Sequence, residues 1–150
     1  MDVLFYHLEH QPLERVLPPL LEKTIARGWW AVVQTGSAER LAAIDTELWT
    51  YRDDSFLPHG TAADGFADQQ PIYLTTGPDT PNAAGVRFLV DGAACDFAAQ
   101  SGMARIVVLF DGRDTDALAQ AREQWRAAKA VASEATYWQQ SPQGRWERKA

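Results

Sequence analysis

The stretch Arg105-Ile-Val-Val-Leu-Phe110 is an unbroken apolar run of the kind that forms a strand buried on both faces. An Asp111-Gly112 turn follows it, and Asp114 or Thr115 can cap a helix that reaches about Ala132. A fully apolar strand that leads into a long helix is typical of α/β proteins, in which helices cover both faces of a parallel sheet. This stretch therefore sets the expected fold class.

The segments on either side of this stretch repeat the alternation of strands and helices. Apolar runs predict strands, and apolar residues at helical spacing predict helices. The expected strands cover residues 3–8, 29–35, 72–76, 86–90 and 136–139, and the expected helices cover about 12–28, 37–49 and 93–101. We expect the first two strands to pair in parallel across the helix between them. The chain, residues 1–150, is thus predicted to be one three-layer α/β domain with a mostly parallel central sheet.

Some segments predict departures from this regular pattern. The Pro18-Pro19 pair lacks two N–H groups, so it should kink the first helix or separate its first turn. Residues 61–70 are small and polar and predict an exposed loop. Residues 77–85 are too many for a tight turn and predict a mobile connection. From about residue 140 to 150 the chain is typical of a loose polar tail, apart from Trp146.

Composition limits the classes of protein to consider. No apolar run approaches the ~20 residues that span a bilayer, and the N-terminus lacks a signal sequence, so we expect a cytoplasmic protein. Cys95 is the single cysteine, which excludes an intrachain disulfide and a thiolate metal cluster.

The distribution of charge is more informative than its total. The net charge of −6 argues against a surface that binds DNA or anionic lipid as a whole. Residues 1–104 carry 6 basic and 14 acidic side chains, a net charge of −8, whereas residues 105–150 carry 8 basic and 6 acidic side chains, a net charge of +2. A basic site is therefore most expected in the C-terminal third.

The sequence lacks the phosphate-binding motifs that often accompany a parallel sheet. Neither G-x-G-x-x-G after the first strand nor G-x-x-x-x-G-K-[ST] anywhere is present. The Gly36-Ser37 turn between a strand and a helix can cradle a single phosphate, so a nucleotide-binding enzyme or sensor remains the alternative hypothesis.

The sequence predicts no catalytic constellation, no metal site and no cofactor. His7 and His10 lie three apart, so on one strand they point to opposite faces and cannot chelate together with Glu9. Cys95 begins an expected helix, where its thiol pKa could be lowered, but a small buried side chain is the favoured interpretation. Three carboxylates suit helix capping as well as Mg²⁺ binding: Asp111, Asp114 and Asp116.

The long helix carries a basic stripe beside its apolar seam. The seam consists of Leu118, Ala121, Trp125, Ala128 and Ala132, and the stripe of Arg122, Arg126 and Lys129. Glu123 does not face Arg122, its neighbour in sequence, so we expect the stripe to keep its charge. Because guanidinium groups bind carboxylates bidentately, the stripe predicts a site for an anion or an acidic peptide.

A second notable stretch, residues 44–60, closes the preceding helix and continues into a connection rich in aromatic and charged side chains. Trp49 and Phe56 either plug the core beneath this connection or form an interface. Its pattern Ile44-Asp45-x-x-Leu48-Trp49, followed by Ser55-Phe56-Leu57-Pro58-His59, resembles the signature of the chi subunit of bacterial DNA polymerase III holoenzyme. The opening strand, the length and the order of elements extend this resemblance over most of the chain.

The resemblance implies a Rossmann-like fold without a phosphate-binding loop and a non-catalytic role in replication. In that family the helix and the Trp/Phe loop together receive the acidic C-terminal tail of single-stranded DNA-binding protein, which ends in phenylalanine. The second partner implied is the psi subunit, which connects chi to the clamp loader. The residues thereby assigned to peptide binding are Trp49, Phe56, Arg122, Trp125, Arg126 and Lys129, while Leu118 stands where the family has a lysine. We therefore expect Trp49 and Phe56 to lie beside the two arginines.

Overall fold

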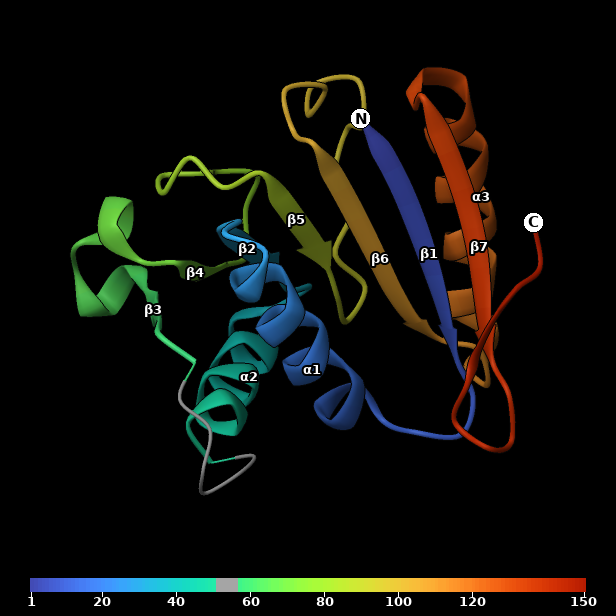
Figure 1. Cartoon of the computed structure of the whole chain (residues 1–150), viewed down its shortest axis with the longest axis horizontal. Helices are drawn as coiled ribbons and strands as arrows, with labels where there is room; N and C mark the ends of the chain where they lie inside the picture. The colour runs from blue at the N-terminus through green and yellow to red at the C-terminus, as the bar shows by residue number, and fades with distance from the viewer. Residues whose placement is uncertain (51–56) are drawn as a thin grey trace.

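In the computed structural model, which describes residues 1–50 and 57–150, a single eight-stranded sheet crosses the molecule (Figure 1). Its strands are β1 (Asp2–Leu8), β2 (Ala31–Gln34), β3 (His59–Thr61), β4 (Ile72–Thr75), β5 (Val86–Leu89), β6 (Arg105–Asp111), β7 (Glu134–Gln140) and β8 (Trp146–Arg148). They follow the order β3-β4-β2-β5-β6-β1-β7-β8, and every neighbouring pair is parallel except β7 and β8. The predicted α/β fold with a mostly parallel sheet is confirmed.

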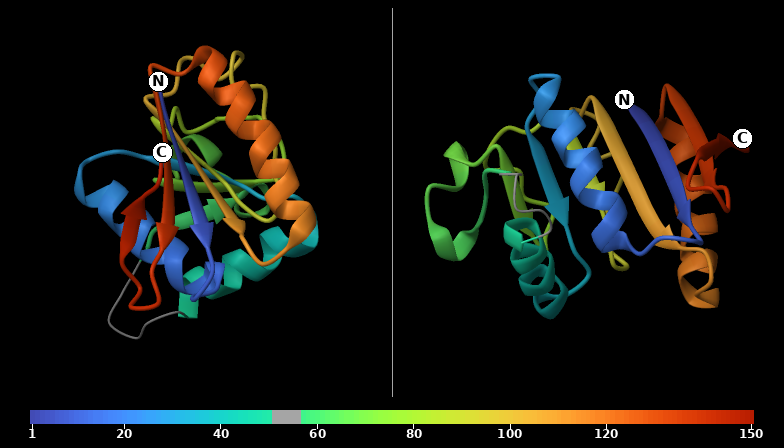
Figure 2. Two further views of the ribbon diagram at one scale, coloured as in Figure 1. Left: turned by 90° about the vertical axis from the view of Figure 1, so that its right-hand side faces the viewer. Right: turned by 60° about the horizontal axis from the view of Figure 1, so that its bottom comes forward.

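The direction of each crossover places the helices on opposite faces of the sheet. The helices of the described residues are α1 (Leu13–Ala26), α2 (Ala38–Thr50) and α3 (Thr115–Val131). The connections through α1 and α2 step toward the β3 edge, whereas α3 carries the chain from β6 to β7 in the other direction. Because parallel crossovers are right-handed, opposite directions put α1 and α2 on one face and α3 on the other (Figure 2).

Each face of the sheet has its own core. Leu17, Ile44 and Leu48 belong to the core beneath α1 and α2, whereas Ala121 and Ala128 belong to the core beneath α3. Successive strand residues contribute to opposite cores, as the alternation of side chains along a strand requires. None of the helices in the described residues is long and apolar enough to cross a lipid bilayer.

Several local predictions were wrong. The strands β1 and β2 do not pair, because β5 and β6 lie between them. The first turn of α1 is not separated from the rest, because the helix continues through Pro18 and Pro19. Residues 93–101 form turns rather than a helix. Residues 61–70 are mostly exposed, as expected of a loop, but the segment begins at the end of β3 and contains two short 3₁₀ turns, Ala62–Asp64 and Ala67–Gln69.

The C-terminal segment is also more ordered than a loose tail. Strand β8 pairs antiparallel with β7, so that Trp138 lies opposite Arg148 and Gln140 opposite Trp146. The Trp146 ring meets the Tyr6 ring edge to face, with their centroids 4.8 Å apart. The apolar ring explains the pairing, because it gives an otherwise polar segment one side chain that packs on the sheet.

The connection at residues 77–85, expected to be mobile, is anchored by the buried side chain of Arg87. Its guanidinium donates hydrogen bonds of 2.6–3.3 Å to two side-chain oxygens and three carbonyl oxygens, those of Gln34, Thr80, Gly77, Pro78 and Asp79. Burial lowers the pKa of Arg87, while Cys95 and Asp79 act in the opposite direction. One cation thus organises the loop that covers β4 and β5 on the α3 face.

Candidate functional site: a basic and aromatic pocket at α3 and β7

Helix α3 is positioned by a capped first turn and an apolar seam. The Asp114 carboxylate accepts hydrogen bonds from the backbone N–H groups of Asp116 and Ala117, which satisfies two donors at the helix start. Further along, the Trp125 ring packs edge to face on the Phe5 ring of β1, with the centroids 5.4 Å apart. These contacts fix which side of α3 faces the sheet and which side remains in solvent.

A cavity of about 410 Å³ opens between α3 and β7. Trp125 and Tyr137 form its aromatic walls, and their rings meet edge to face with the centroids 6.0 Å apart. Leu118 adds apolar surface to the lining. The residues that line the cavity are His7, Leu118, Ala121, Arg122, Trp125, Arg126, Tyr137, Gln139 and Ala150. We call this cavity the α3/β7 pocket.

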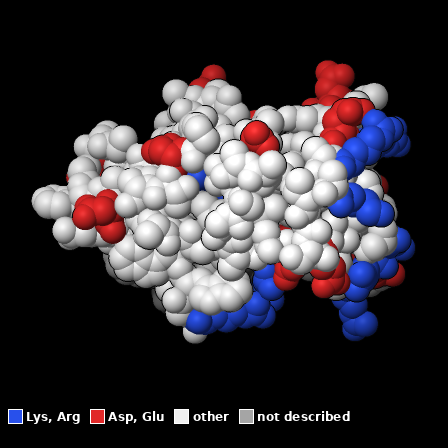
Figure 3. Space-filling model, turned by 90° about the horizontal axis from the view of Figure 1, so that it is seen from above, with Lys and Arg blue, Asp and Glu red and all other residues white. Residues whose placement is uncertain are grey.

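Arg122 and Arg126 line the α3/β7 pocket, and Lys129 lies next to the Trp125 ring that forms one of its walls. Arg122, Arg126 and Lys129 are exposed, and the Lys129 ammonium lies 5.5 Å from the centroid of the Trp125 ring. The expectation that the stripe keeps all its charge was wrong, because Glu123 forms an ion pair with Arg126 three residues later. Arg122 has no ion pair with any described residue. Basic side chains also gather at this end of the molecule in Figure 3.

A hydrogen-bonded pair stiffens the base of the pocket. The Nδ1 atom of His7 lies 2.6 Å from the Tyr137 hydroxyl, and its Nε2 atom lies 3.0 Å from the Glu9 carboxylate. Burial raises the pKa of Tyr137, with Arg122 opposing and Glu9 reinforcing that shift, so the hydroxyl stays protonated at neutral pH. The polar atoms of His7 are therefore engaged within the protein.

Trp49 does not share this pocket, and the predicted joint socket is wrong in this respect. The side chain of Trp49 is 53% exposed at the end of α2, on the opposite face of the sheet and near the β3 edge. Its ring lies over His59, with the centroids 4.4 Å apart. Phe56, the other predicted apolar contact, lies outside the described residues. The structure thus brings together Arg122, Trp125, Arg126 and Lys129 but separates Trp49 from them.

The Gly36-Ser37 turn has a structural explanation. A Cβ atom on Gly36 would lie 2.1 Å from the carbonyl oxygen of Asp91, so this position needs glycine for close packing. The Ser37 hydroxyl accepts a hydrogen bond from the backbone N–H of Arg40 near the start of α2. Both residues thereby have roles that do not involve a phosphate.

The other candidate reactive residues have structural roles as well. Burial raises the pKa of the Cys95 thiol to about 11, the direction opposite to activation. Asp111 accepts hydrogen bonds from Arg113, and this contact lowers the pKa of its carboxyl group. Glu9 reaches both His7 and His10, at 3.0 and 3.9 Å, but within residues 1–50 and 57–150 no three such side chains are grouped to hold a metal ion.

Sequence reasoning missed the part of the pocket that β1 and β7 supply. Tyr137 and Gln139 lie on β7, and His7 lies near the end of β1. Their alternation along a predicted strand places Tyr137 and Gln139 on one face. Only the strand order, with β7 beside β1, shows that this face meets α3.

Comparison with known proteins identifies one family. The model of the family described as "DNA polymerase III chi subunit, HolC" matches residues 1–136, which include all of α3 and end one residue before Tyr137. A curated protein of Rickettsia prowazekii (strain Madrid E), "Probable DNA polymerase III subunit chi", is 29% identical over 85 residues. This match covers 57% of the chain and 52% of the relative, so the chain spans about half the length of that protein.

Proposed function

Because the chain belongs to the DNA polymerase III chi subunit family, we propose that its α3/β7 pocket holds the acidic C-terminal tail of single-stranded DNA-binding protein. The family supports an accessory role in DNA replication. On this proposal the chain is a non-catalytic adaptor that works in the bacterial cytoplasm and joins the clamp loader to the protein that coats single strands.

The observation that carries the proposal is the position of Arg122 beside an aromatic cavity. Arg122 has no ion pair with a described residue, so its guanidinium is available to a carboxylate from outside. The walls formed by Leu118, Trp125 and Tyr137 suit a phenyl ring. An acidic peptide that ends in phenylalanine supplies both groups within a few residues.

Simple energetics suit a reversible tether. Burial of one phenyl ring stabilises the complex by ~1.5–3 kcal/mol. Each hydrogen bond between an arginine and a carboxylate adds ~1.5–3 kcal/mol. After the cost of association, a dissociation constant on the order of micromolar is expected. Since the basic side chains are exposed, the affinity should fall as salt is added.

An adaptor also needs a second surface, and we propose that it lies on the face opposite the pocket. The Trp49 ring there lies over His59 and is 53% exposed, and tryptophan is a residue that often anchors interfaces. We place the contact with the clamp loader, through the psi subunit where the organism has one, on this face. Both partners could then bind at the same time, because the sheet separates the two surfaces.

A titration of peptides tests the tail proposal. An acidic peptide that ends in phenylalanine should bind when measured by calorimetry at low salt. The same peptide with alanine at its end should bind at least about tenfold more weakly, because the cavity loses its ring. Equal affinities for the two peptides, or no detectable binding of either, would rule out the proposed use of the pocket.

A further inference from the structure

A second hollow, on the face opposite the α3/β7 pocket, is lined by cations and aromatic rings. It has a volume of about 300 Å³ and lies between α1 and the strands β1, β5 and β6. Its basic lining residues are Arg15, Lys23, Arg27 and Arg105, and no acidic side chain of the described residues lines it. We call it the α1 groove. On a protein with a net charge of −6, four cations in one groove are a marked local excess.

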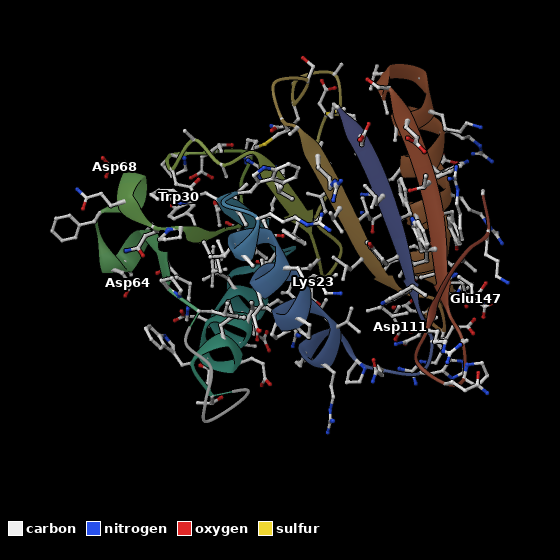
Figure 4. The ribbon with its side chains drawn as sticks, in the orientation of Figure 1. Lys23, Trp30, Asp64, Asp68, Asp111 and Glu147 are labelled. Atoms are coloured by element: carbon white, nitrogen blue, oxygen red, sulfur yellow. The ribbon has the colours of Figure 1, made fainter. Side chains whose placement is uncertain are left out.

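The groove follows from the topology of the sheet. The crossovers through α1 and α2 both step toward the β3 edge, so none of the described helices covers β1 and β7 on this face. The hollow beside α1 lies on this uncovered part of the sheet, where Leu4 and Tyr6 of β1 line it. Lys23 lies on the side of α1 that faces this space (Figure 4).

The cations on α1 form a ridge along the groove. Arg15, Pro19, Lys23 and Arg27 recur at intervals of four residues, so they lie along one side of the helix. At 1.5 Å per residue, the twelve steps from Arg15 to Arg27, which is the residue after the end of α1, span ~18 Å. A ridge of this length exceeds what one mononucleotide reaches and suits a chain of phosphates.

The opposite wall supplies aromatic rings and a fourth cation. Arg105 lies over the Trp29 ring, 5.4 Å from its centroid, and its Nε atom is buried without a hydrogen-bond partner among the described residues. Trp29 is 37% exposed, and Tyr6 and Trp146 are half-buried beside it in the groove. Burial raises the pKa of Tyr6. The positive charges of Arg105 and Arg27, which lie near its hydroxyl, oppose that rise.

The part of the chain that the structure describes does not neutralise the cations of the groove. None of Arg15, Lys23, Arg27 and Arg105 has an ion pair with a described residue. The Glu14 carboxylate, on the same helix, instead pairs with Arg40 of α2 at 3.0 Å. The positive charge of the groove is thus available to a ligand.

We propose that the α1 groove binds a short segment of single-stranded nucleic acid. The phosphates lie along the ridge of Arg15, Lys23 and Arg27, and a base stacks on the exposed ring of Trp29. A row of cations facing aromatic rings fits a polyanion that carries flat rings. The interaction goes beyond the proposed tail binding and does not depend on it, because the two sites lie on opposite faces of the sheet.

The test is a binding measurement with a labelled oligothymidylate of about ten nucleotides. Its fluorescence anisotropy should rise on titration with the protein at low salt and fall again as salt is added. Arg15→Glu should weaken binding about fivefold or more, since it reverses one charge on the ridge. Glutamate suits the first turn of a helix, so this variant should fold normally, which circular dichroism can verify.

Arg113→Glu is the matched control, because it makes the same change of charge at an exposed arginine outside the groove. It should weaken binding of the oligonucleotide by less than about twofold. A second variant, Trp29→Ala, should weaken binding by removing the ring on which a base stacks.

Four outcomes would overturn the proposal. The first two are no rise in anisotropy on titration, and equal weakening of oligonucleotide binding by Arg15→Glu and Arg113→Glu. The other two are competition by thymidine monophosphate as strong as that by unlabelled oligonucleotide, and displacement of the labelled oligonucleotide by an acidic peptide. If the wild-type protein does not bind the tail peptide, the proposed function is contradicted, but the oligonucleotide test of the α1 groove remains valid.

Discussion

Trp125 and Tyr137 meet edge to face across the joint between α3 and β7, with ring planes inclined at 86°. This contact joins a helix to the strand that follows it and forms the aromatic part of the α3/β7 pocket. Because Trp125 also packs on Phe5, the wall rests on the core of the sheet. The pocket is therefore a product of the fold and should keep its shape without a ligand.

The base of the pocket depends on a glycine. A Cβ atom on Gly112 would lie 1.7 Å from the Nε2 atom of His7. Gly112→Ala must therefore displace the His7 ring, which is hydrogen-bonded to Glu9 and Tyr137. We expect a loss of ~1–3 kcal/mol in the free energy of unfolding, measured with urea. Gly102→Ala is the matched control, since its Cβ would meet nothing within 4 Å. Equal stability of the two variants would contradict this role of Gly112.

The loop at 77–85 should depend on the buried cation that anchors it. Arg87→Met keeps much of the side-chain volume but leaves several oxygen atoms without their donor. We expect a loss of about 3 kcal/mol in the free energy of unfolding, because buried acceptors then lack partners. Hydrogen exchange should also become faster in residues 77–85. Unchanged exchange there would show that Arg87 does not hold the loop.

Alkaline pH should destabilise the protein through thiol and phenol groups that are buried or partly buried. Burial raises the pKa of Cys95 to about 11 and also raises the pKa values of Tyr6, Tyr73 and Tyr137. An unfolded thiol titrates near ~8.5 and an unfolded tyrosine near ~10. The folded state thus keeps protons that the unfolded state has lost, so stability should fall as pH rises above ~8.5.

Urea unfolding at several pH values measures this fall. In Cys95→Ala the fall in the free energy of unfolding between pH ~8.5 and ~10 should disappear, because the tyrosines of the unfolded chain begin to titrate only above pH ~10. An identical pH dependence in the variant and the wild type would contradict the assignment to Cys95.

The sequence predicted which segments form strands and helices better than it predicted which strands lie side by side in the sheet. Apolar runs gave strands such as 105–110, and the spacing of apolar residues gave the long helix after it, because both patterns report local burial. The helix expected at 93–101 was wrong. Ala93 and Phe97 of this segment are buried in the core on the α3 face, so tertiary packing overrides the local pattern. Strand β8 was missed because one tryptophan in a polar segment does not produce the alternation of apolar and polar residues that predicts a strand.

The candidate site was predicted in part for the same reason. Arg122, Trp125, Arg126 and Lys129 lie on one helix, so their spacing alone places them close together. Whether Trp49 joins them depends on the direction in which each crossover steps along the sheet, which the sequence pattern does not contain. Tyr137 and His7 were missed because they meet α3 only through the strand order.

The most direct test of the proposed tail site is a calorimetric titration of an acidic peptide ending in phenylalanine into three variants beside the wild-type protein. Arg122→Ala should weaken binding about tenfold, whereas Arg113→Ala, at an exposed arginine outside the pocket, should leave it unchanged. Trp49→Ala should also leave it unchanged, because Trp49 lies on the opposite face. Full affinity in Arg122→Ala, or loss of binding in Trp49→Ala, would contradict the assignment of the tail to the α3/β7 pocket.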